Sequence, residues 1–218
     1  MTKSLPRAGD LLALERQCWG AGYQRVAGVD EVGRGAWAGP VVAAAVILPA
    51  GERDWPYRDS KQLSQARRQH LAELLARQAL TWSAVAIPAA EVDRLGLLVA
   101  TKAASLLALQ LLDPLPQAVI TDYLPLSVPW PLRCPAGADR SSASVAAASI
   151  LAKVLRDAAM VDLAGLYPGY GFERHKGYGT ASHRAALADC GPSPVHRRSV
   201  APVRDLLGSG SWADLGQR

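Results

Sequence analysis

The stretch RVAGVDEVGRG, residues 25–35, decides the fold. Its apolar first part, Arg25 to Asp30, is typical of a buried strand, and the run from Val41 to Leu48 predicts a second strand after a glycine-rich turn. Adjacent residues on a strand face opposite ways, so Asp30 and Glu31 can meet one site only if the first strand ends or bulges there. The glycines that follow permit such a break.

Outward from this stretch, the chain alternates between helical and extended patterns, which predicts one α/β domain over residues 1–205 and a tail over 206–218. Further strands are expected at 81–87, at 118–121 and around Leu132. Helices are expected at 11–19, 60–80, 89–95, 97–112, 141–163 and 180–189, with loops elsewhere in the last third.

Composition restricts the partners and the compartment. The formal charge of +5 and the isoelectric point near 9.3 favour a polyanion as partner. Arginine outnumbers lysine, which suits bidentate phosphate contacts but equally fits a GC-rich genome. The three widely spaced cysteines offer neither a disulfide framework nor a Cys-x-x-Cys metal site, and no apolar run is long enough to span a bilayer. We therefore expect a cytoplasmic protein without membrane contact.

Two more acidic residues stand at places where chemistry is plausible. Asp122 follows the apolar run 118–121, and Asp139 precedes the long helix expected from Ser141. Each has an ordinary explanation: Asp122 as a turn former, Asp139 as a helix cap, and Asp30 with Glu31 as a solvated pair. The alternative is a cluster of carboxylates around hard divalent cations, as a metal-dependent nuclease requires.

Several blocks, in order along most of the chain, resemble the type 2 ribonuclease H group, specifically ribonuclease HII. The blocks are AGVDEVGRG from Ala27, AGPV from Ala38, DSKQLS from Asp59, Gly96 with Ala100-Thr101, AASILAKV from Ala147 with Arg156-Asp157, YGF from Tyr170, HKGYGT from His175, and HRRS from His196. The resemblance implies a ribonuclease H-like α/β fold, a central mixed five-stranded sheet flanked by helices, with a helical C-terminal region. It also implies that the strand at 118–121 lies beside the first strand.

The resemblance further implies that Asp30, Glu31, Asp122 and Asp139 are the metal-binding, catalytic carboxylates, with Mg²⁺ or Mn²⁺ as cofactor. The implied activity is endonucleolytic, two-metal-ion hydrolysis of RNA in RNA–DNA hybrids and incision 5′ of ribonucleotides embedded in duplex DNA. The products would carry 3′-hydroxyl and 5′-phosphate ends. We expect a monomer whose partners are these nucleic acids.

Substrate contacts are expected where the same blocks approach the ribose and the phosphates. Gly33, Arg34 and Gly35 resemble the family's 2′-hydroxyl sensor. Tyr178 resembles its reader of the junction between ribonucleotide and deoxynucleotide, although a half-buried loop tyrosine is the alternative. Lys61 and Lys176 are expected to contact phosphates.

Other polar residues leave two explanations open. Ser142 and Ser149 could bind phosphate or cap the long helix, and Arg197 and Arg198 could contact phosphates or be solvated. The histidines show no metal-ligand spacing. Tyr123 departs from the family, which commonly has glycine after the third carboxylate, and this could shift the backbone of Asp122.

Three functions remain distinguishable from sequence: the ribonuclease, a metal-dependent DNA nuclease of the same fold, and a duplex-binding protein without turnover. The block around Tyr178 argues against the second function. The presence of all four carboxylates argues against the third.

Overall fold

A five-stranded mixed sheet forms the centre of the computed structural model, which describes residues 10–57 and 63–208. The strands are β1 (Val26–Val32), β2 (Val41–Ile47), β3 (Thr81–Ile87), β4 (Ala118–Thr121) and β5 (Leu132–Arg133). Their order is β3-β2-β1-β4-β5, with β1 antiparallel to β2 and parallel to β4, and β4 parallel to β5. The predicted sheet, including the position of the strand at 118–121 beside the first, is confirmed.

The helices agree with the sequence patterns except in the last third. They are α1 (Ala13–Gly20), α2 (Gln65–Gln78), α3 (Ala89–Leu95), α4 (Leu97–Gln110), α5 (Ala143–Leu166), α6 (Phe172–His175), α7 (Ala181–Cys190) and α8 (Ala201–Leu207), with a 3₁₀ turn at Ala138–Arg140. The expectation of loop around α6 and α8 was wrong. Both helices are short and carry too few turns to produce a recognisable apolar period.

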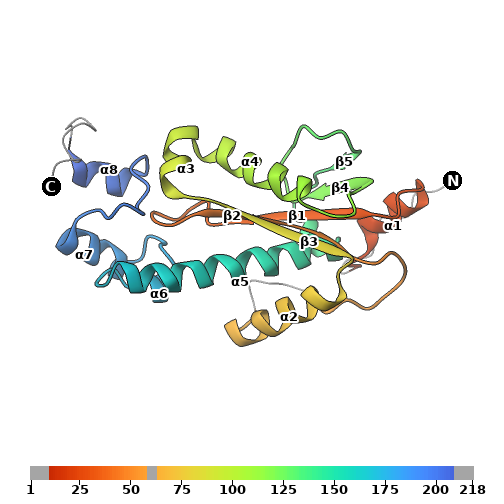
Figure 1. Ribbon diagram of the computed structural model, residues 1–218, viewed down its shortest axis with the longest axis horizontal. Coiled ribbons are helices and arrows are strands. Elements are labelled where there is room, and N and C mark those ends of the chain that lie inside the picture. The colour runs from red at the N-terminus through yellow and green to blue at the C-terminus, as the bar shows by residue number, and fades with distance from the viewer. Residues whose placement is uncertain (1–9, 58–62, 209–218) are drawn as a thin grey trace. The chain divides into compact units, whose positions relative to one another are not determined.

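Strand β2 is buried along its whole length because helices cover both faces of the sheet around it. Val42, Ala44 and Val46 pack in one cluster with residues of α2 and α5. Ala45 and Ile47 point the other way and pack against residues of α4. Figure 1 shows α2 and α5 on one side of the sheet and α4 on the other. Burial on both faces explains the continuous apolar run of β2.

Helix α5 begins in direct contact with β1 because Gly28 has no side chain. A Cβ atom at Gly28 would lie 2.1 Å from the carbonyl carbon of Ser144. This close approach brings the first turns of α5 against the strand that carries Asp30 and Glu31.

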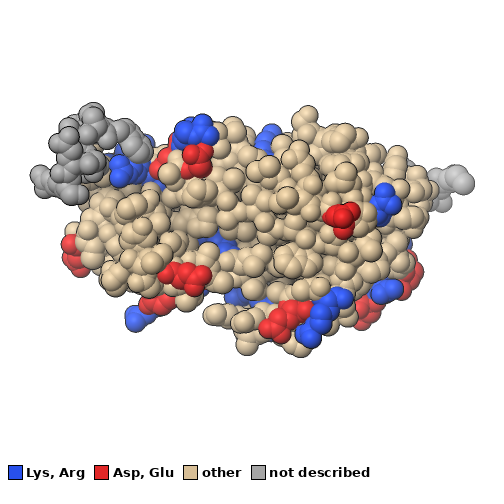
Figure 2. All heavy atoms as spheres, viewed as in Figure 1, with Lys and Arg blue, Asp and Glu red and all other residues tan. Residues whose placement is uncertain are grey.

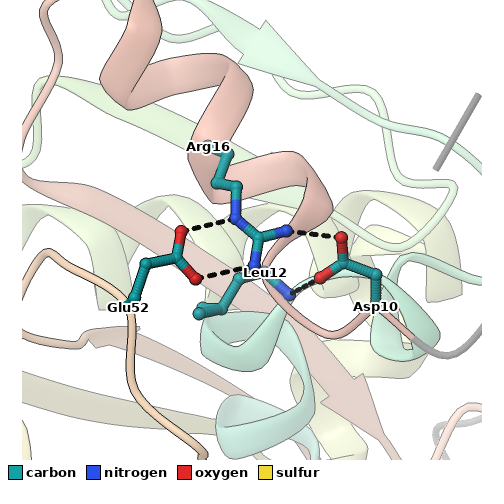
Figure 3. A network of polar contacts seen from close by, with 4 residues as sticks. All are labelled: Asp10, Leu12, Arg16 and Glu52. Atoms are coloured by element: carbon teal, nitrogen blue, oxygen red, sulfur yellow. Dashed lines mark hydrogen bonds and ion pairs between the residues drawn. The ribbon is translucent and has the colours of Figure 1, made fainter. Parts of the chain in front are cut away.

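The start of α1 is held by a small polar network, drawn in Figure 3. Asp10 accepts a hydrogen bond from the backbone N–H of Leu12 at 3.2 Å and forms an ion pair with Arg16. Arg16 also donates through Nη2 to Glu52 at 2.7 Å. These groups are largely exposed, so the network orients the helix end and adds little to stability.

The chain divides into two compact units. The first holds the described residues up to Val32 together with 42–86 and 101–156; the second holds 33–41, 87–100 and the residues from 157 onward. The expectation of a single catalytic domain over 1–205 stays a prediction. In the region expected as a tail, α8 extends to Leu207, and residues 209–218 lie outside the described part.

Charged side chains of both signs are intermixed on the face drawn in Figure 2. A wide area between them carries neither sign, so this face shows no continuous basic surface among the residues that the structure describes. Within residues 10–57 and 63–208, none of the helices combines the length and the apolar character that crossing a membrane requires.

Candidate active site

Four carboxylates of the first unit lie at or near the ends of β1 and β4. Asp30 and Glu31 lie within β1, which stays paired with β2 in unbroken register through Val32. The expectation that the strand ends or bulges at these residues was wrong. Because side chains alternate along a regular strand, Asp30 shares the face of Gly28, against α5, and Glu31 shares the opposite one.

Asp30 is a carboxylate in a negatively charged setting. Its pKa is raised to about 7, mainly because the group is buried and further because the charges of Glu31 and Asp122 lie nearby. A hydrogen bond from the side chain of Ser149 on α5 and one from the backbone N–H of Glu31, at 2.9 Å, act in the opposite direction. The site therefore holds more negative charge than the protein itself compensates.

The parallel pairing of β1 with β4 brings Asp122 near Asp30. Thr121 at the end of β4 pairs with Val29 of β1, and the residue that follows each of them in the chain is an aspartate. The Oδ1 atom of Asp122 accepts hydrogen bonds from the backbone N–H groups of Gly137 at 2.7 Å and Ala138 at 3.1 Å. A turn-forming aspartate would bind its own neighbours, whereas this one binds a segment 15 residues away.

Asp139 lies in the 3₁₀ turn Ala138–Arg140, next to the backbone that holds Asp122. It does not cap α5, because Ser142 occupies that position and its hydroxyl accepts from the N–H of Val145 at 3.2 Å. The Asp122 contact with residues 137 and 138 thus ties the third and fourth carboxylates into one segment.

Tyr123 has a backbone conformation that favours glycine. Its φ angle is +51°, in the left-handed region, and its side chain is 76% exposed. The carboxylate of Asp122 nevertheless keeps its two backbone hydrogen bonds. Whether the tyrosine shifts the backbone of Asp122 relative to a glycine at this position stays a prediction.

The chemistry of these side chains fits a hard divalent cation. Oxygen ligands are what Mg²⁺ and Mn²⁺ prefer, and a bound cation would counter both causes of the raised pKa of Asp30, first its desolvation and then the nearby charges of Glu31 and Asp122. Among residues 10–57 and 63–208, however, no three or more His, Cys, Asp or Glu side chains already stand in the arrangement of a metal site.

Ser142 points into the protein. It is fully buried, and its hydroxyl donates to Glu15 at 2.7 Å while capping α5. Glu15 also accepts from the backbone N–H of Ser144 at 3.0 Å. Of the two roles left open for Ser142, the structure shows the cap, and a buried hydroxyl with these partners has no access to a phosphate. The role of Glu15 was missed, because a buried glutamate on an amphipathic helix has no local signature.

The residues expected to sense the ribose lie in the second unit. Gly33 has a φ of +91° and closes a turn through a hydrogen bond from Ala36, leaving Arg34 and Gly35 exposed at its tip. Arg197 underpins this turn. Its buried guanidinium donates to the carbonyl of Gly39 at 2.9 and 3.0 Å and to that of Arg34 at 3.1 Å.

Arg197 is therefore neither a phosphate contact nor a solvated charge, the two roles considered from sequence. Arg198 and Ser199 are held through their backbone N–H groups by the carboxylate of Asp93, at 2.7 and 3.0 Å.

Tyr178 is half-buried and pairs through its backbone with Ala36, which follows the turn at Gly33–Gly35 in the same unit. Lys176 adopts a φ of +52°, and its ammonium donates to the carbonyl of Glu173. Lys61 lies outside the described residues.

Comparison with known proteins identifies the family. A family model described as Ribonuclease HII matches residues 27–202. A ribonuclease HII from Thermus thermophilus is 57% identical over 190 residues, covering 87% of this chain and 92% of the relative. That of Halalkalibacterium halodurans is 44% identical over 196 residues, covering 90% and 74%.

Solved structures agree with the sequence matches. The crystal structure of ribonuclease H2 from Pyrococcus horikoshii OT3 superposes with a TM-score of 0.72 at 26% identity, covering 84% of this chain and 96% of that one. Ribonuclease HII in a complex with PCNA from Archaeoglobus fulgidus superposes with a TM-score of 0.63 at 26% identity, covering 76% and 87%. The chain therefore belongs to the ribonuclease HII family, whose members are endonucleases that use divalent metal ions to cleave the RNA of RNA–DNA hybrids.

Proposed function

We propose that this protein incises duplex DNA on the 5′ side of embedded ribonucleotides, in addition to cleaving hybrids, by two-metal-ion catalysis. The observation that carries the proposal is the position of Asp30 in β1 near Asp122, which directly follows the neighbouring parallel strand β4; burial and then the charges of Glu31 and Asp122 raise the pKa of Asp30 to about 7. Two partly buried carboxylates this close together cost stability unless a cation lies between them, even though Asp122 accepts two backbone hydrogen bonds.

Asp30, Glu31, Asp122 and Asp139 would hold Mg²⁺ or Mn²⁺. Glu31 starts from the opposite face of β1, but only Val32 follows it in the strand and its charge already acts on Asp30, so its side chain would join the site around the strand end. The cations would supply activation of water and stabilisation of the leaving oxygen, giving 3′-hydroxyl and 5′-phosphate ends. The protein orients the ligands: Ser149 holds Asp30, and the N–H groups of residues 137 and 138 hold Asp122.

Recognition of the ribose would fall to Gly33, Arg34 and Gly35, whose exposed turn offers backbone groups to a 2′-hydroxyl, and to Tyr178. Lys61 and Lys176 would contact phosphates. In Lys176 the ammonium already bonds a carbonyl, so it would have to exchange that partner for a phosphate.

We also propose a monomer acting in the cytoplasm. Cys18, Cys134 and Cys190 carry free thiols, as expected in a reducing compartment.

The test is cleavage of a labelled DNA duplex with one embedded ribonucleotide, with and without Mg²⁺ or Mn²⁺, for the wild type and for Asp30→Asn. We expect metal-dependent cutting 5′ of the ribonucleotide, absent from an all-DNA duplex and abolished in the variant. Cutting of the all-DNA duplex would instead indicate a DNA nuclease. Binding without cutting under either metal would indicate a duplex-binding protein.

A further inference from the structure

Three histidines of the second unit form a buried cluster that the proposed mechanism does not use. His175, His183 and His196 are 8%, 0% and 1% exposed, and the first two rings stack at 4.3 Å. His175 accepts at Nδ1 from the N–H of Gly177, so its Nε2 carries the proton that is donated to the carbonyl of Tyr170. Its hydrogen bonds therefore define a neutral ring.

The other two histidines form a chain with a single consistent set of protons. His196 accepts at Nδ1 from the N–H of Ser193 at 3.0 Å, so its proton is on Nε2. That proton points at Nε2 of His183, 3.1 Å away. His183 therefore accepts at Nε2 and donates from Nδ1 to the carbonyl of Tyr178 at 3.0 Å, because a carbonyl can only accept.

This chain of hydrogen bonds is compatible only with neutral imidazole rings at His183 and His196. A second proton on His183, at Nε2, would set two N–H groups against each other across the 3.1 Å contact, and a second proton on His196, at Nδ1, would face the backbone N–H of Ser193. Burial lowers the pKa of both rings, that of His196 to about 4, and the proximity of the other histidines acts in the same direction. The hydrogen-bond pattern thus assigns the N–H at Nδ1 of His183 as the donor to the carbonyl of Tyr178.

The hydrogen-bond chain holds the turn just before Tyr178, and this turn is strained. Lys176 and Gly177 both have left-handed backbones, with φ of +52° and +79°. A Cβ atom at Gly177 would lie 2.4 Å from the carbonyl oxygen of Ala38, so the turn packs tightly on the segment after the sensor glycines. A non-glycine residue in this conformation persists only where its surroundings over-determine it.

We propose that the chain from Ser193 through His196 to His183 positions Tyr178, so that His183 and His196 are positioning residues for recognition of the ribonucleotide. The inference rests on the proposed function of Tyr178 as the reader of the junction. The hydrogen-bond chain fixes the carbonyl of Tyr178 and the bridge to Ala36 fixes its backbone on the other side, so the backbone from which the tyrosine side chain extends is held in place.

Two amide substitutions separate this role from simple packing. In His183→Asn the amide nitrogen takes the position of Nδ1 and keeps the bond to Tyr178. In His183→Gln it takes the position of Nε2 and loses that bond. We expect kcat/KM on a duplex with one ribonucleotide to fall about tenfold in His183→Gln, the size of one net hydrogen bond, and about twofold or less in His183→Asn.

The decisive measurement is kcat/KM for His183→Gln and His183→Asn when each is combined with Tyr178→Ala. If His183 acts through Tyr178, the two amide variants become equal there, within about twofold. The exposed His70→Leu on α2 serves as a control for loss of a histidine, and thermal unfolding confirms that each variant is folded.

Each other outcome overturns the inference. Equal losses for Gln and Asn, or a Gln loss that persists without Tyr178, would mean that His183 only packs the core. If Tyr178→Ala alone has no effect on this substrate, the proposed reader is wrong and the positioning role falls with it. That result is distinguishable from a failure at His183 alone.

Discussion

Strain at single residues accompanies the carboxylate site. Asp30 is partly buried near two like charges, and Tyr123 has a left-handed backbone next to Asp122. Both features cost folding free energy and both lie within one residue of a proposed metal ligand. Such costs are characteristic of sites kept for function rather than for stability.

Asp30→Asn should stabilise the metal-free protein. The amide removes a charge that burial and neighbours disfavour while keeping an acceptor for the N–H of Glu31. We expect the free energy of unfolding at pH 8 to rise by about 2 kcal/mol after allowance for solvent screening. Urea denaturation in EDTA measures it, and added Mg²⁺ should narrow the difference by stabilising only the wild type.

Tyr123→Gly should also stabilise the fold, by about 1 kcal/mol, because glycine adopts a φ of +51° without the penalty of a side chain. Activity should be retained, since the two hydrogen bonds to Asp122 come from residues 137 and 138. Unfolding in urea and cleavage of the single-ribonucleotide duplex measure the two effects. A loss of activity at unchanged stability would instead show that the exposed ring contacts substrate.

At the scale of elements, the meeting of β1 with α5 matters most. Gly28 lets the start of α5 lie against β1, where two serine hydroxyls form hydrogen bonds. That of Ser142 caps α5, and that of Ser149 bonds Asp30. The site therefore depends on one close packing contact between a strand and a helix.

Gly28→Ala should displace α5. The added Cβ would meet backbone atoms of Ser144 and Val145 at 2.1 to 2.2 Å, which cannot yield as a flexible side chain would. We expect a loss of about 3 kcal/mol in unfolding free energy and a fall in activity as the contact of Ser149 with Asp30 is disturbed. Gly20→Ala, where a Cβ would meet nothing within 4 Å, is the matched control and should change neither. A tolerated Gly28→Ala would mean that the strand and helix separate without cost.

At the scale of the whole molecule, acid affects two buried groups in opposite directions. The pKa of His196 is lowered from 6.5 to about 4, mainly by burial and then by His183. The unfolded chain takes up this proton below pH 6.5, whereas the folded chain does not until about pH 4, so stability is lost across that window. Asp30, whose pKa is raised from 3.8 to about 7, gains stability over nearly the same range in the metal-free protein.

Comparing the unfolding free energies of the wild type and His196→Gln isolates the contribution of His196 to the pH dependence. The difference in unfolding free energy between wild type and variant should shift against the wild type by about 3 kcal/mol from pH 7 to pH 4. Urea denaturation at a series of pH values measures this, because the contributions of Asp30 and other groups cancel in the difference. If the difference in unfolding free energy does not change with pH, the pKa of His196 is not lowered in the folded protein.

The sequence by itself determined the family, the strands around Asp30 and Asp122, and the long helix after Asp139. These follow from local apolar periodicity and from motifs whose residues are close in the chain. The break predicted after Asp30 failed because pairing with β2 extends the strand through Val32, and that pairing is not a local property.

Only the tertiary structure decided which polar residues face inward. Ser142 and Arg197 have the sequence character of surface groups, yet both are buried because their partners, Glu15 for one and the carbonyls of Arg34 and Gly39 for the other, come from segments more than 120 residues away. The chain from His196 to Tyr178 likewise depends on residues brought together by folding. Burial and hydrogen-bond partners are set by long-range contacts, and for that reason no local pattern could reveal them.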